Sequence, residues 1–148
     1  MKMASVLGEH EQSTIREAFS ALDRDVDVTL ELGPSAAPVT LLAAGGRELD
    51  SNAITRDLVE AVCALGRATA GGAVGLEIVE HDDPGPWPRT TIGAGLVYQG
   101  MPAGYELASL VGAIVEAGRE ESTLSLASLD HLAALERDVA IDVYVTPT

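Results

Sequence analysis

The segment Pro84-Gly85-Pro86-Trp87-Pro88 places three prolines within five residues. Such a segment cannot lie inside a helix or a central strand, because proline lacks a backbone N–H and fixes φ. Alternating apolar and polar residues precede it at 74–81, and strand-like residues follow it at 89–98 around Gly93-Ala94-Gly95. The pattern predicts a strand, a proline-rich loop and a tight hairpin with glycines at its turn.

Apolar periodicity predicts further helices and strands in the rest of the chain. Ser13 and the Asp50-Ser51-Asn52 run supply N-cap side chains, while Gly66 and Gly118 are suited to end helices. The helices are expected at residues 12–22, 50–65, 107–115 and 125–135, and the strands at 26–32, 38–43 and 139–145. This mixture of elements is typical of the α/β class.

Charge and composition exclude several classes of function. The 148 residues carry 9 Lys and Arg against 23 Asp and Glu, a formal charge of −14, which is the wrong sign for nucleic acid or an anionic membrane. Aromatic residues make up 3%, so the core must be aliphatic. There is no apolar stretch of signal-peptide or membrane-spanning length, and the expected location is the cytoplasm.

The chain has a single cysteine, Cys63. An internal disulfide, a C-x-x-C redox pair and a cysteine-based zinc site within the chain are therefore excluded. Cys63 could be a redox thiol or a passive packed thiol. We favour the passive thiol, because the residue lies in the middle of its predicted helix, about 180° from the main apolar stripe, and not at a helix N-terminus that would lower its pKa.

Several short segments resemble one known family. They are Pro88-Arg89-Thr90-Thr91-Ile92, Tyr98-Gln99-Gly100-Met101-Pro102-Ala103-Gly104-Tyr105-Glu106, Arg119-Glu120-Glu121, Asp138-Val139 and Val145-Thr146-Pro147-Thr148. In this order and spacing they resemble the tandem glutaredoxin-like protein disulfide oxidoreductases of prokaryotes and, more distantly, the N-terminal domain of the flavoprotein subunit of alkyl hydroperoxide reductase. The resemblance implies a thioredoxin-like mixed sheet flanked by helices, with an extra C-terminal helix and strand.

The resemblance also implies a domain organisation. Members of the family carry two thioredoxin-like units in tandem, so residues 1–120 resemble a first unit, and residues 121–148 resemble the linker helix and first strand of a second unit. The second unit's C-x-x-C would begin just beyond Thr148. Redox-active first units carry another C-x-x-C where this chain has Gly45 to Asn52, a stretch without cysteine. The first unit therefore resembles redox-silent members of the wider family.

The resemblance assigns a structural role to Pro88, which matches the family's cis loop proline. Its neighbour Trp87 could anchor a docked partner or could pack over the sheet edge, and packing is the favoured interpretation. An acidic cluster that could bind a divalent cation is better explained as a solvated loop. It comprises Glu77, Glu80, His81, Asp82 and Asp83. No catalytic, cofactor-binding or metal-binding residue is assigned.

Two functions follow from the resemblance. The first is a redox-silent structural or docking module of a dithiol-disulfide oxidoreductase system that serves redox homeostasis. The alternative is a truncated protein disulfide oxidoreductase, whose enzymatic activity would be thiol–disulfide exchange. The expected partner is another protein or a second thioredoxin-like unit. The apolar face of residues 139–145 is expected to join the sheet of the same chain or, as the second option, to pair in a homodimer.

Overall fold

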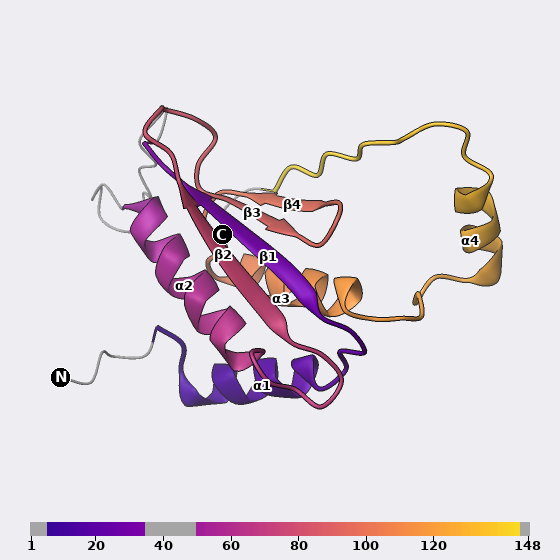
Figure 1. Cartoon of the computed structure of the whole chain (residues 1–148), viewed down its shortest axis with the longest axis horizontal. Helices are drawn as coiled ribbons and strands as arrows, with labels where there is room; N and C mark the ends of the chain where they lie inside the picture. Colours follow the sequence, from indigo (N-terminus) through magenta and orange to yellow (C-terminus); the bar gives the residue numbers. More distant parts are fainter. Residues whose placement is uncertain (1–5, 35–49, 146–148) are drawn as a thin grey trace.

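A computed structural model describes residues 6–34 and 50–145 of the chain. In the described residues, a mixed four-stranded sheet has the order β2-β1-β3-β4 (Figure 1). The strands are β1 (Val26–Leu32), β2 (Val74–Glu80), β3 (Arg89–Ile92) and β4 (Leu96–Gln99). Strand β1 is central: it pairs in parallel with β2 and antiparallel with β3, which continues into β4 as a hairpin. The strand, loop and hairpin expected around the prolines are therefore present.

Helices α2 (Ser51–Leu65) and α3 (Tyr105–Ala117) pack against this sheet, and α1 (Glu9–Phe19) packs on these two helices. Helix α2 contacts β1 and β2, α3 contacts β3, and α1 contacts both α2 and α3. The alternation of β1 explains the arrangement: Val28 and Leu30 are buried on the helical side, whereas Asp27 is exposed on the other side. The core is almost wholly aliphatic, with Phe19 as its one fully buried aromatic side chain among the described residues.

The helix boundaries follow local capping chemistry. Asp50 caps α2 by accepting a hydrogen bond from Ala53 N–H at 3.1 Å, and Gly66 and Gly118 are the C-caps of α2 and α3, as expected. Helix α1 begins earlier than the sequence predicts. Its N-cap is Gly8, whose N–H donates to the Glu11 carboxylate at 2.8 Å, so Ser13 lies inside the helix and does not cap it. The strand predicted at 38–43 lies outside the described residues.

The C-terminal part of the chain differs from expectation in one element. The predicted helix is present as α4 (Leu126–Ala133), which lies apart from the sheet and the other helices (Figure 1). Residues 139–145 form no strand and are exposed, so the expected added edge strand is not formed. The alternating apolar pattern favours a strand, but a strand also needs a neighbour with free backbone groups, and these residues pair with none in the described chain.

Candidate functional site

The C-terminal end of β1, the first turn of α2 and the loop that ends in Pro88 meet at one end of the sheet. Pro88 is buried, and its peptide bond with Trp87 is cis, the conformation that the resemblance implied. The Pro88 carbonyl accepts a hydrogen bond from Gly100 N–H at 2.9 Å, which ties the loop to the end of β4. We call this region the β1–α2 junction.

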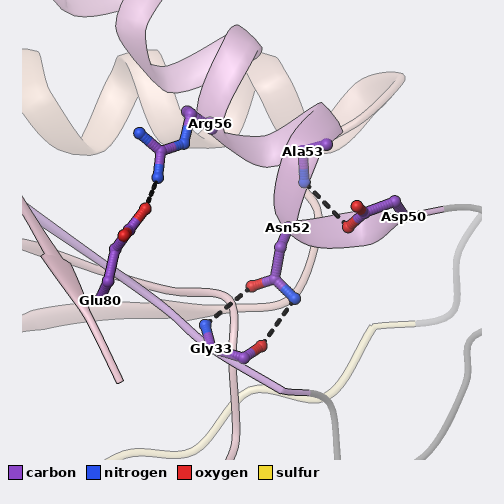
Figure 2. A network of polar contacts seen from close by, with 6 residues as sticks. All are labelled: Gly33, Asp50, Asn52, Ala53, Arg56 and Glu80. Carbon is purple, nitrogen blue, oxygen red and sulfur yellow. Dashed lines mark hydrogen bonds and ion pairs between the residues drawn. The ribbon is translucent and has the colours of Figure 1, made fainter. Parts of the chain in front are cut away.

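A side chain of α2 fixes the end of β1 at this junction (Figure 2). The amide of Asn52 donates to the Gly33 carbonyl at 2.8 Å and accepts from Gly33 N–H at 3.2 Å. Both backbone groups of the residue after β1 are thereby satisfied. Asn52 therefore holds the strand end in register with the first turn of α2, next to the Asp50 cap.

Trp87 packs into the junction. Its ring stacks on the imidazole of His81 with a centroid separation of 4.0 Å and an interplanar angle of 2°, and its Nε1–H donates to the Asp83 carbonyl at 3.1 Å. Gly33 and Gly85 touch the ring closely: a Cβ atom at either position would lie 2.6 Å or 2.5 Å from the nearest ring atom. The indole is half-buried and held on several sides. Docking through Trp87 stays a prediction.

Glu31 links the strands on the sheet face opposite the helices. One carboxylate oxygen lies 3.1 Å from His81 Nε2, and the other lies 3.8 Å from Arg89 Nε. Glu31 and Arg89 are paired across β1 and β3, which places both side chains on the same face. Because the three side chains are all partly exposed, their ion pairs add little to the free energy of unfolding. The network orients the Trp87 loop.

A shallow pocket of about 400 Å³ opens beside these groups. Its wall includes Gly33, Asn52 and the ion pair between Arg56 and Glu80, which joins α2 to the end of β2 (Figure 2). The wall carries three carboxylates, those of Asp50, Glu80 and Asp82, beside one guanidinium, that of Arg56. None of its described lining residues is a thiol or a hydroxyl nucleophile.

Cys63 lies far from this junction. It occupies the last turn of α2, twelve residues after Ser51, which is about 18 Å along the helix axis. The side chain is 1% exposed, and burial raises the pKa of its thiol to about 12, against an opposing effect of the nearby Arg67. A thiol of this kind is neutral at physiological pH and is not the thiolate that attacks disulfides. The structure therefore places it as a packed core residue.

The sequence pattern predicted that Cys63 lies away from the main apolar stripe, and this prediction is wrong. The buried face of α2 runs through Thr55, Val59 and Cys63 as well as through Leu58 and Val62. This face is wide because α2 is covered by the sheet on one side and by α1 on another. The stripe predicted from the sequence runs through Ile54, Leu58, Ala61, Val62 and Leu65; Leu58 and Val62 of this stripe are buried, and the other three are only partly buried.

Residues of the predicted acidic cluster pair with different partners. Glu80 pairs with Arg56, and His81 contacts Glu31. Within residues 6–34 and 50–145, no three histidine, cysteine or acidic side chains gather in a way that could hold a metal ion. The bonds of Asn52 and Glu31 were not predicted. The only sequence signals for them were an amide in the first turn of α2 and a carboxylate on the polar side of an alternating strand.

The fold is thioredoxin-like, as comparison with solved structures shows. The chain is similar to the structure of a cysteine-to-alanine mutant of the alkylhydroperoxide reductase AhpF from Enterococcus faecalis, at 18% identity and a TM-score of 0.64. It is also similar to the NTD_N/C domain of the same protein, at 18% identity and a TM-score of 0.65. A protein disulfide oxidoreductase from Aeropyrum pernix matches at 19% identity and a TM-score of 0.68.

These matches cover 87%, 88% and 90% of this chain but 61%, 62% and 56% of the respective structures. The chain thus spans about three fifths of the length of the solved structures that it matches. No family model matches the sequence, and no curated protein is significantly similar to it. Among the described helices, none combines the length and the apolar character needed to cross a membrane.

Proposed function

We propose that this thioredoxin-like chain is a redox-silent docking module of a dithiol-disulfide oxidoreductase system, located in the cytoplasm. Two observations support the absence of catalysis by the chain itself. Thiol–disulfide exchange with intramolecular resolution needs two thiols, and the chain has one. That thiol is 1% exposed and lies at the opposite end of α2 from the β1–α2 junction.

The observation that carries the docking role is the apolar surface of residues 121–145. Helix α4 has no buried residue, although Leu126, Leu129, Leu132 and Ala133 share one face of it. Leu126 is 81% exposed, and Ile141 and Val143 further along the chain are 82% and 79% exposed. Aliphatic surface of this extent is unfavourable in water and is typical of a segment that a partner covers.

We propose that the partner is a second thioredoxin-like unit that carries a C-x-x-C pair. The structural neighbours are an alkylhydroperoxide reductase and a protein disulfide oxidoreductase, and this chain spans about three fifths of their lengths. In this proposal, α4 and residues 139–145 pack on that unit as its linker helix and first strand. A homodimer through the same segment is the competing partner.

A reductase assay tests the redox-silent part of the proposal. The 148-residue chain should not accelerate insulin reduction by dithiothreitol above the reagent blank, and Cys63→Ser should behave in the same way. Turnover by the wild-type chain that Cys63→Ser abolishes would contradict the proposal, because it would make the buried thiol catalytic.

Binding measurements test the docking part. A recombinant thioredoxin-like unit with a C-x-x-C pair is titrated onto the chain by calorimetry. The double variant Leu126→Asp and Leu132→Asp should weaken binding at least tenfold, because both changes place a charge on the apolar face of α4. Ala127→Asp is the matched control, since Ala127 is exposed and lies about 160° from the centre of that face. Equal binding by all variants would exclude α4 as the docking element.

A further inference from the structure

A second apolar feature lies between α1 and α3. It is a groove of about 900 Å³, and most of its exposed lining is apolar. Ile15, Val111 and Val115 line it, and each of these core residues keeps 6–8% of its surface exposed. The groove therefore reaches down to the hydrophobic core. We call it the α1–α3 groove.

Several small side chains line the groove. Ala18 and Ala21 line the groove on the side of α1, and Ala108 and Gly112 line it from α3. The turn after α1 is tied to the C-terminal end of α3 by two hydrogen bonds. The backbone N–H of Asp23 donates to the Gly118 carbonyl at 2.8 Å, and Arg24 Nε donates to the Ala117 carbonyl at 3.1 Å.

Gly112 marks an open position in the groove. A glycine inside a helix costs about 1 kcal/mol relative to alanine. A Cβ atom placed on Gly112 would have no described neighbour within 4 Å, so the chain's own packing does not require a glycine there. The position is exposed and has open space around it.

The margins of the groove are acidic. Glu11 and Glu17 line it from α1, and Glu116 lines it from α3, where it pairs with Arg119 at 3.6 Å. Glu17 has no ion-pair partner among the described residues. With a formal charge of −14 on the chain, the field around this apolar groove attracts basic groups.

We propose that the α1–α3 groove binds an amphipathic helix of a partner protein, with aliphatic side chains in the groove and lysine or arginine residues along the acidic margins. A helix suits a channel between two helices, because its side-chain ridges fit between theirs. Helix α4 of a second copy is a poorer occupant. Its polar residues include Asp130, and Glu136 and Asp138 follow it, so it would bring negative charge to an acidic margin.

Synthetic peptides test this proposal with the full 148-residue chain. The probe is a fluorescein-labelled helical peptide with leucines at i, i+3, i+4 and i+7 and lysines at its flanks, and binding is measured by fluorescence anisotropy. A peptide of the same pattern with glutamate in place of lysine should bind at least tenfold more weakly. Affinity for the lysine peptide should also fall as salt is added.

Substitutions in the groove separate specific binding from general attraction to an acidic protein. Gly112→Leu should weaken binding of the lysine peptide at least tenfold, because its side chain occupies the groove. The space around Gly112 and the higher helix propensity of leucine predict that this variant folds, which circular dichroism checks. Gly95→Leu is the matched control, since Gly95 lies in the exposed β3–β4 turn and also has open space around it.

Each outcome of these experiments bears on the proposal. Glu17→Lys should reduce the affinity for the lysine peptide and increase that for the glutamate peptide. If Gly112→Leu and Gly95→Leu bind the lysine peptide equally, the peptide does not use the groove and the proposal is wrong. If light scattering shows that the wild-type chain dimerises and Gly112→Leu is monomeric, a second copy fills the groove and the assignment to a partner helix is wrong.

Discussion

The free energy of unfolding depends on the protonation of the buried Cys63 thiol. Burial raises its pKa from 9.0 to about 12 in the folded chain, so the folded state holds the thiol proton more tightly than the unfolded state. The resulting stabilisation is fully present below pH 9 and is lost as the pH rises from 9 towards 12. Cys63→Ala should therefore show a shallower decline in the free energy of unfolding across this interval.

Urea unfolding at pH 8, 9.5 and 10.5 measures this slope. The slopes are compared and not the absolute values, because removal of a buried side chain also costs stability at every pH. Tyr98→Phe is measured alongside, since burial and the nearby Glu106 raise the pKa of Tyr98 as well and its phenol also contributes to the decline. If the wild-type chain and Cys63→Ala decline in parallel, the thiol does not titrate between the folded and unfolded states as described.

Thr90 is a buried residue whose polar side-chain atom has no partner among the described residues. It is 0% exposed in β3, and its hydroxyl oxygen has no hydrogen-bond partner among the described residues. Valine has nearly the same shape without the hydroxyl group, so Thr90→Val should raise the free energy of unfolding by about 1 kcal/mol. Thermal melting measures the change. Thr91→Val, half-buried on the opposite sheet face, should change it by less than about 0.5 kcal/mol.

At the scale of elements, the link between Asn52 and Gly33 fixes how α2 follows β1. Asn52→Ala removes both hydrogen bonds and leaves two backbone groups at the strand end without this partner. We expect a loss of about 1–2 kcal/mol in the free energy of unfolding. Hydrogen exchange should also show faster exchange of the Gly33 amide. Asn52→Asp keeps the acceptor but loses the donor. In this variant the Gly33 amide should exchange at a rate between those of the wild-type chain and Asn52→Ala.

Elements with strong local signals could be predicted from the sequence. The period of apolar residues in α3, the N-cap Asp50 and the glycines of the β3–β4 hairpin each act within a few residues of the chain. The prediction of a strand at 139–145 was wrong, because alternating apolar and polar residues indicate only one of the two strands that a pair requires. The prediction that Cys63 lies away from the buried face of α2 was wrong, because the width of a helix's buried face depends on how many elements pack against the helix.

At the scale of the whole molecule, α4 and the residues after it contribute little to the folded state of residues 6–123. Helix α4 has no buried residue, and residues 139–145 pair with no described strand. Deletion of residues 124–148 should leave the melting temperature within about 2 °C of the wild-type value. Differential scanning calorimetry measures it. A larger decrease would mean that the segment packs on its own chain in solution.

The β1–α2 junction could be located from the sequence only in outline. The resemblance around Pro88 indicated the end of the sheet, and the three prolines indicated the loop. Its bonds connect distant residues: Asn52 meets Gly33 across 19 positions, and His81 meets Glu31 across 50. No local pattern encodes such pairs, because they depend on how the sheet brings separate segments together.

The packing of Trp87 has an optical consequence for the protein. This ring is the only indole in the chain, and it is stacked on His81 between Gly33 and Gly85. All intrinsic tryptophan emission therefore originates at the β1–α2 junction. A molecule that enters the pocket beside it should shift the emission maximum, whereas a helix seated between α1 and α3 should leave the spectrum unchanged. One unlabelled fluorescence titration can thus identify a newly found binder that occupies the β1–α2 junction.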